Sequence, residues 1–199
     1  MNPQVVTIAG EGRLDLEVAA QLVLYYGGEV GNRYDSGGKS GIHSKIKGYN
    51  NSAQKVNVPW LVLLDLNSEE CPISLRDKLL SEIAPLMCFR IAIKEIEAWL
   101  MGDKENLEIY LGISRGSLPT EPEKIENPKE ELLRFARRSK KREIREGMVR
   151  KNSSNLDPGP RYTTLLRRYV QNHWRPEVAA ERVDSLRRAM ACVERLLKL

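Results

Sequence analysis

Acidic residues follow three apolar runs of this chain that are typical of buried strands. They are Glu11, Asp65, Glu95 and Glu97, and they follow the runs at 5–9, 60–64 and 87–93. In an open α/β sheet, ligands bind outside the carboxyl ends of the strands. Mg²⁺ uses one or two carboxylates there, together with waters and substrate phosphates. The spacing predicts metal-assisted phosphoryl chemistry at this edge, and the alternative is that the acids only cap the helices that follow.

The first half of the chain alternates short apolar runs with segments of helical spacing. We expect strands at 5–9, 29–34, 60–64 and 87–93, and helices at 14–26, 44–56, 72–82 and 94–100. Alternation of this kind predicts right-handed crossovers and a Rossmann-like, about four-stranded, mostly parallel sheet flanked by helices. The run at 60–64 is apolar on both faces, which is typical of a central strand.

The second half contains no convincing strand. Helices are expected at 105–111, 129–139 with an extension over 144–149, 162–172 and 176–197. Three prolines between residues 114 and 128 indicate an extended connection. The sequence thus predicts an α/β domain at 1–103 and a helical, basic C-terminal extension at 104–199 that packs on it.

Charge is unevenly distributed along the chain. Residues 1–100 carry a net charge of −2 and residues 101–199 a net charge of +7, and the stretch 134–151 holds nine basic residues against two acidic ones. A basic half joined to an acidic half favours a polyanionic partner such as nucleic acid. The alternative is an ordinary solvated helix face.

Bulk features exclude several classes of protein. No apolar run approaches the ~18 residues that a membrane helix needs, and the first residues lack the basic and apolar regions of a signal peptide. The three cysteines are scattered, which indicates reduced thiols and a cytoplasmic location. Their spacing does not match a zinc site.

Two further patterns could indicate a chemical role. The segment 37–40, Gly-Gly-Lys-Ser, lacks the first glycine of a phosphate-binding loop, so we expect a flexible basic loop that contacts a nucleic-acid backbone through Lys39, Lys45 and Lys47. Tyr49 in the same region could stack on a base, although a packing role is the simpler interpretation. No nucleophile-elbow motif accompanies the two histidines.

The motifs together resemble the Toprim superfamily of topoisomerases, primases, recombination proteins and overcoming-lysogenization-defect nucleases. The likeness rests on Gly-Glu-Gly at 10–12 and on Asp-x-Asn at 65–67. The whole chain more closely resembles conserved hypothetical bacterial proteins of the Toprim type. The residues that carry this closer likeness are at 45–50, 60–65, 95–100, 137–139 and 159–162.

The resemblance implies a site for Mg²⁺, or Mn²⁺, at the strand ends. Its implied metal ligands are Glu11, Asp65, Asn67 and Glu69, and its implied catalytic residues are Glu11, Asp65 and Glu97, with Glu11 as general base or acid. The family has a second aspartate where this chain has Asn67, which removes one negative charge. Glu69, Glu70 or Glu97 is then expected to supply the missing carboxylate.

The leading hypothesis is a cytoplasmic, Mg²⁺-dependent nuclease that acts on DNA or RNA, in phage or plasmid defence beside an ATPase partner. Besides the three lysines above, the residues expected to hold nucleic acid are Arg137, Arg138, Lys140, Lys141, Arg142 and Arg145. One alternative is a non-catalytic module that binds nucleic acid or an ATPase through a degenerate Toprim site. Another is a small-molecule phosphotransferase or phosphatase, which would leave the basic stretch unused.

Overall fold

The computed structural model describes residues 4–67, 71–151 and 156–199. The chain divides into two compact units. One is formed by Met1–Ile93 with Ser185–Leu199, and the other by Lys94–Asp184. This division differs from the predicted boundary at residue 103, because the last helix of the chain returns to the first unit. Each unit is described by itself below.

The first unit contains a four-stranded sheet, which confirms the predicted α/β class. Its strands are β1 (Val5–Gly10), β2 (Glu29–Asp35), β3 (Trp60–Asp65) and β4 (Met87–Ala92). All described pairings are parallel, in the order β2-β1-β3-β4. The carboxyl ends of the strands therefore share one edge, where Gly10 pairs with Asp35 and Asp65 pairs with Ala92.

The apolar pattern of β3 explains its central position. Side chains alternate between the faces of a strand, and Trp60, Val62 and Leu64 belong to the same hydrophobic cluster as residues of the helices before and after β3. Leu61 and Leu63 point to the opposite face and are equally buried. A strand that buries both faces needs a continuous apolar run, and each fully buried leucine contributes about 1.5 to 3 kcal/mol.

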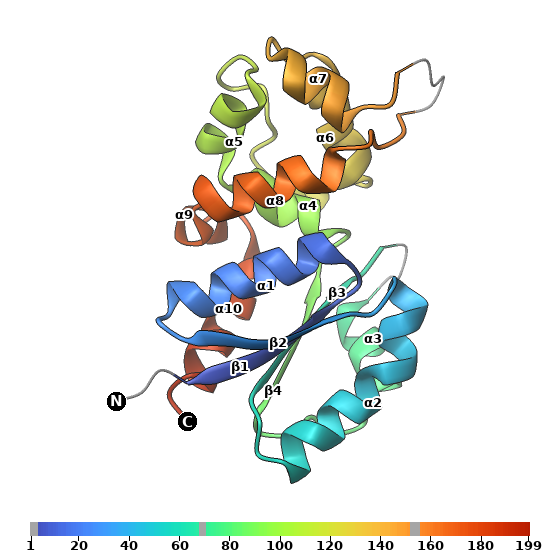
Figure 1. Ribbon diagram of the computed structural model, residues 1–199, viewed down its shortest axis with the longest axis vertical. Coiled ribbons are helices and arrows are strands. Elements are labelled where there is room, and N and C mark those ends of the chain that lie inside the picture. The colour runs from blue at the N-terminus through green and yellow to red at the C-terminus, as the bar shows by residue number, and fades with distance from the viewer. Residues whose placement is uncertain (1–3, 68–70, 152–155) are drawn as a thin grey trace. The chain divides into compact units, whose positions relative to one another are not determined.

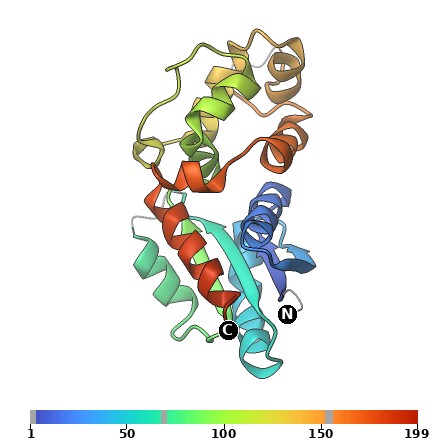
Figure 2. The same ribbon diagram turned by 90° about the vertical axis from the view of Figure 1, so that its left-hand side faces the viewer.

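Helices cover both faces of this sheet. One face carries α1 (Arg13–Tyr25) and α10 (Asp184–Leu196), and the other carries α2 (Lys39–Lys55) and α3 (Pro72–Leu79), as Figures 1 and 2 show. A disulfide joins Cys88 on β4 to Cys192 on α10, with their Cα atoms 6.0 Å apart. The expectation of reduced thiols is wrong for this pair, because the 104 residues between them hid the return of α10 to the sheet.

The helix α2 begins earlier than predicted. The sequence indicated a flexible loop up to residue 43, whereas the helix starts at Lys39. Gly37 and Gly38 have positive φ angles of 73° and 97° and turn the chain into the helix. The buried positions 42, 46, 49 and 53 then follow helical spacing.

The second unit is helical, which confirms the predicted helical character of the C-terminal part. Its helices are α4 (Ile96–Gly102), α5 (Lys104–Leu111), the 3₁₀-helix η1 (Pro122–Lys124), α6 (Pro128–Arg137), α7 (Arg142–Met148), α8 (Tyr162–Asn172) and α9 (Pro176–Ala180). The predicted helix at 176–197 is two helices, α9 and α10. In the described part of the chain no helix has both the length and the apolar character needed to cross a membrane.

A buried ion pair helps to hold this second unit together. The Asp103 carboxylate is fully buried and accepts hydrogen bonds from the Arg175 guanidinium, at 2.6 and 3.1 Å, and from the Arg175 backbone N–H at 2.9 Å. Removal of one partner from such a pair leaves an uncompensated buried charge. The pair therefore ties the end of α4 to the start of α9.

We predict that Gly10→Ala destabilises the protein by about 2 kcal/mol. A Cβ at this position would lie 2.6 Å from the Cβ of Asp15, so the turn after β1 would have to shift. Urea denaturation measures the loss. Gly48→Ala is the matched control, since a Cβ on Gly48 of α2 meets nothing within 4 Å and should stabilise the helix by about 0.5 to 1 kcal/mol. Equal stability of the two variants would contradict the account of the turn.

Candidate functional site

The strand order of the sheet reverses between β1 and β3, and Glu11 and Asp65 meet at that point. The chain leaves β1 toward β2 on one side, and β3 lies on the other side of β1. The backbone N–H of Asp65 donates a hydrogen bond of 3.0 Å to Glu11 Oε1. Ligands of open α/β sheets bind at such a reversal point, so the structure brings this predicted pair together where a ligand is expected.

The loop that carries Glu11 is held in place from two further sides. The Glu11 carbonyl accepts a hydrogen bond of 2.7 Å from the Gly38 N–H, and the Gly10 carbonyl accepts one of 3.0 Å from Ser36. On the other side, Asp15 Oδ2 accepts the Gly12 N–H at 2.9 Å. Asp15 thus caps the start of α1. The position of the Glu11 carboxylate is thus fixed by the ends of β1, β2 and β3.

Asn67 lies two residues beyond Asp65 in a left-handed backbone conformation, with φ of 54°. Asparagine tolerates this conformation better than most residues. Its Nδ2 donates a hydrogen bond of 3.3 Å to the Asp65 carbonyl. An ionised aspartate could not make this bond, which gives the departure from the Asp-x-Asp pattern a structural reason. Glu69 and Glu70, the predicted substitutes, lie outside the described residues.

Asp35 is an acidic residue at the same edge that sequence reasoning missed. It ends β2, pairs with Gly10 in the sheet register and is exposed. Its Oδ1 accepts the Gly37 N–H at 3.1 Å. Its place directly after the expected strand at 29–34 was the signal that could have found it.

Two carboxylates and one amide oxygen suit one hard cation. A carboxylate has about four lone-pair sites, so the bond from Asp65 leaves Glu11 able to bind a metal ion. Mg²⁺ keeps several waters and needs only one or two carboxylates. The described residues contain no group of three or more His, Cys, Asp or Glu side chains that could hold a metal. Glu11, Asp65 and Asn67 thus offer oxygen donors of the type that a single, partly hydrated ion uses.

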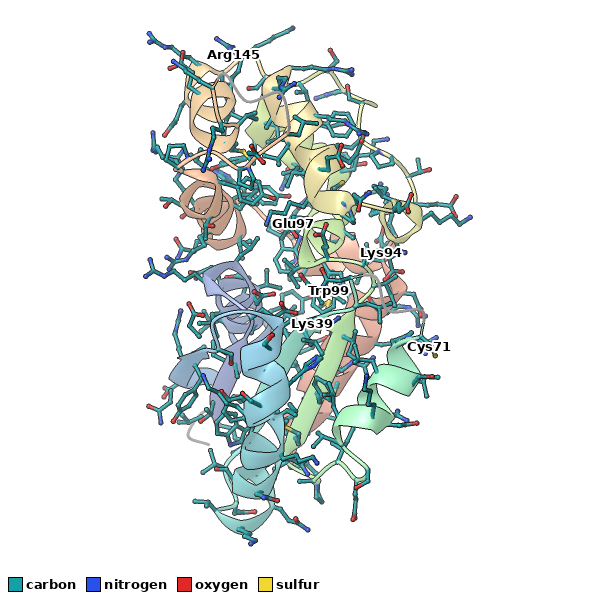
Figure 3. All side chains as sticks on the ribbon, turned by 90° about the vertical axis from the view of Figure 1, so that its right-hand side faces the viewer. Lys39, Cys71, Lys94, Glu97, Trp99 and Arg145 are labelled. Atoms are coloured by element: carbon teal, nitrogen blue, oxygen red, sulfur yellow. A yellow bond between two sulfur atoms is a disulfide. The ribbon has the colours of Figure 1, made fainter. Side chains whose placement is uncertain are left out.

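Glu97 lies in the second unit, on α4, within a hydrogen-bonded network (Figure 3). The side chain is buried, and Tyr162 Oη donates a hydrogen bond of 2.9 Å to its Oε1. Burial raises the pKa of Glu97, and the nearby charge of Glu95 raises it further, while Lys129 and Tyr162 act in the opposite direction. Its catalytic role beside Glu11 and Asp65 stays a prediction.

Glu95, which the sequence placed at the strand edge, caps a helix. Its Oε2 accepts the backbone N–H of Lys129 at 2.8 Å, in the first turn of α6. A carboxylate at a helix N-terminus satisfies a free N–H and interacts favourably with the helix dipole. The alternative expected these acids to cap the helices that directly follow them, whereas the Glu95 side chain caps α6 and makes no cap hydrogen bond to α4.

The predicted nucleic-acid contacts fall into two groups. Lys141 donates hydrogen bonds to the carbonyls of Ile109 and Tyr110, Arg145 donates to the carbonyl of Ser139, and Arg142 pairs with Glu146. Arg145 is labelled in Figure 3. In contrast, Arg137, Arg138 and Lys140 are exposed, and within the described ranges no hydrogen bond or ion pair involves their side chains. These three cations are the ones available to a polyanion.

The remaining residues predicted to contact nucleic acid lie on α2. Lys39 is its first residue and is labelled in Figure 3, and Lys45 and Lys47 are exposed farther along the helix. Tyr49 is buried and stacks on Trp60 with ring centroids 4.7 Å apart. The packing role is therefore the correct interpretation of Tyr49.

Comparison of the chain with models of protein families, with curated proteins and with solved structures found no match.

We predict that Glu97→Gln changes how stability depends on pH. Because the pKa of Glu97 is raised in the folded state, the unfolded chain loses its proton first as the pH rises above about 4.3. Wild-type stability then falls relative to the variant until the folded pKa is passed. Urea denaturation between about pH 4 and pH 7 measures this difference.

Glu126→Gln is the control for that experiment, since Glu126 is an exposed glutamate of the same unit. Its stability should follow the wild type at every pH. Parallel curves for the wild type and Glu97→Gln would show that the Glu97 carboxyl is not desolvated in the folded state.

Proposed function

We propose that the protein is a metal-dependent hydrolase of phosphodiester bonds in nucleic acid, with Glu11 and Asp65 as metal ligands. The observation that carries the proposal is the hydrogen bond of 3.0 Å that joins these two residues at the reversal of strand order. The basic residues without partners, Arg137, Arg138 and Lys140, support a polyanionic substrate over a small phosphorylated one.

Mg²⁺ or Mn²⁺ would be held by the carboxylates of Glu11 and Asp65 and by the amide oxygen of Asn67, with waters and a substrate phosphate as the other ligands. When bound, the ion supplies Lewis-acid stabilisation of phosphoryl oxygens and lowers the pKa of a coordinated water. Glu11 would hold a proton of the attacking water. Its own placement comes from the backbone N–H of Asp65.

The proposal includes a cytoplasmic location and an ATPase partner in phage or plasmid defence. These parts rest on the resemblance to Toprim proteins in the motifs around Glu11 and Asp65. They are separate from the hydrolytic chemistry, which can be tested on the protein alone.

The second candidate function is a non-catalytic module that binds nucleic acid or an ATPase. Asn67 favours it, because the amide replaces a charged ligand and its Nδ2 is committed to the Asp65 carbonyl. The lack of a three-residue ligand group among residues 4–67, 71–151 and 156–199 points the same way. Metal-dependent hydrolysis separates this module from the nuclease.

We predict that Glu11→Gln lowers the rate of Mg²⁺-dependent hydrolysis by at least about 100-fold. Glutamine keeps an oxygen that can accept the Asp65 N–H, so the variant removes the charge while the loop geometry is retained. Asp65→Asn should lose activity to a similar extent. Cleavage of labelled single-stranded and double-stranded DNA and RNA measures the rates.

Glu29→Gln is the control, since Glu29 is an exposed glutamate at the amino end of β2 and should leave cleavage unchanged. If the wild type cleaves none of these substrates with Mg²⁺ or Mn²⁺, the binding module is the correct function. Cleavage that survives in Glu11→Gln and Asp65→Asn would remove both residues from the site.

We predict that Asn67→Asp tightens Mn²⁺ binding roughly tenfold, because it adds a charged oxygen ligand. The same change costs about 1 kcal/mol of stability, since the hydrogen bond to the Asp65 carbonyl is lost. Calorimetric titration and urea denaturation measure the two effects. Asn57→Asp is the matched control, because Asn57 also has a positive φ angle, 57°. Equal Mn²⁺ affinity in all three proteins would place Asn67 outside the ligand set.

A further inference from the structure

The second unit contains a pocket of about 520 Å³ along one side of α6. It extends from the first turn of the helix, at Lys129, to its last residue, Arg137. These residues are separated by roughly 12 Å along the helix axis. Pockets that hold small organic groups have volumes of about 300 to 1,000 Å³, so this one can hold a group larger than an inorganic ion.

One of the two cations of the pocket lacks a carboxylate partner. No ion pair among the described residues involves Arg137. The Lys129 ammonium lies over the Tyr162 ring, 5.6 Å from its centroid, and acts electrostatically on the buried Glu97 carboxyl. The acid Glu130 is paired with Arg134 at 2.5 Å. The Arg137 guanidinium is thus the charge that the pocket offers to an anion.

The other residues of the pocket could contact apolar groups and hydrogen-bond donors of a ligand. Leu133, Leu156 and Pro158 supply apolar surface on its walls. Glu95 supplies a carboxylate, one oxygen of which accepts the Lys129 N–H. A bare phosphate would gain nothing from the apolar wall and would be repelled by Glu95. A nucleotide has a phosphate for Arg137, a sugar and a base for the wall, and amino or hydroxyl donors for the carboxylate.

We propose that this pocket binds one nucleotide of a single-stranded nucleic acid, with its phosphate at Arg137 and its sugar and base against Leu133, Leu156 and Pro158. The proposal deepens the proposed nuclease function and rests on it for the identity of the polyanion. A single strand is the occupant because its unstacked nucleotides can enter a pocket. A duplex keeps its bases stacked and presents mainly phosphates.

The test measures binding of a labelled oligothymidylate of about twelve nucleotides by fluorescence anisotropy in EDTA, where metal-dependent cleavage cannot occur. Arg137→Gln should weaken binding about tenfold. It should also reduce the slope of log affinity against log salt concentration by about the contribution of one phosphate contact. Leu156→Glu should weaken it comparably, because the added charge faces the bound phosphate and sugar.

Arg138→Gln is the matched control. Arg138 follows Arg137 directly, carries the same charge and is exposed without a side-chain partner in the described part of the chain, but it does not line the pocket. Its affinity should stay within about twofold of the wild type. Equal losses in Arg137→Gln and Arg138→Gln would reveal a general basic surface and overturn the pocket.

Competition against the labelled oligothymidylate identifies the kind of ligand that the pocket binds. An unlabelled oligothymidylate should compete at far lower concentration than thymidine monophosphate or a duplex of the same length. Competition by the mononucleotide at the concentration of the strand would make this a free-nucleotide site, and stronger competition by the duplex would make it a backbone surface. Either outcome overturns the proposal.

Failure of the pocket and failure of the nuclease are distinguishable. If the wild type and Glu11→Gln bind the strand equally while neither cleaves it with Mg²⁺, the pocket stands and the nuclease fails. If no strand binds but a small aryl phosphodiester is hydrolysed in a Glu11-dependent way, the hydrolytic site stands and the pocket is wrong.

Discussion

The hydrogen bond from the Asp65 backbone to the Glu11 carboxylate joins residues that are 54 positions apart. It exists only because β1 and β3 are neighbouring parallel strands, so that their carboxyl ends lie at the same edge of the sheet. The loop around Glu11 is further tied to Gly38 and therefore to the end of β2. The ladder of four strands, both helical layers and the buried face of β3 serve to keep this edge in register. A shift of one residue along β3 would separate the pair.

Placing carboxylates at one edge has an electrostatic cost. Like charges at a shared site repel each other, and a bound cation would relieve that repulsion. In the second unit, three acidic side chains have partners within the protein. Glu97 is buried with a hydrogen bond from Tyr162, Asp103 is paired with Arg175, and Glu95 caps α6. The first arrangement gathers Glu11 and Asp65 at the ends of their strands, whereas the second satisfies its acids within the protein.

Much of the fold was predictable because local pattern determined it. The apolar runs marked the four strands, and the rule that parallel strands end at one edge predicted that Glu11 and Asp65 would meet. The features that escaped prediction depend on contacts between distant segments. The disulfide of Cys88 depends on the return of α10 to the sheet, and the commitment of Lys141 depends on the carbonyls at the end of α5. Charge counts alone could not separate Lys141 from Arg137.

The central claim is that the Glu11 and Asp65 carboxylates form a binding site for one divalent cation. A crystal structure of the protein soaked in Mn²⁺, with the metal located by anomalous scattering, tests it most directly. The account predicts one peak within about 2.2 Å of a carboxylate oxygen of each residue. Ordered Glu11 and Asp65 side chains with no peak between them, or a peak bound only elsewhere, would contradict it.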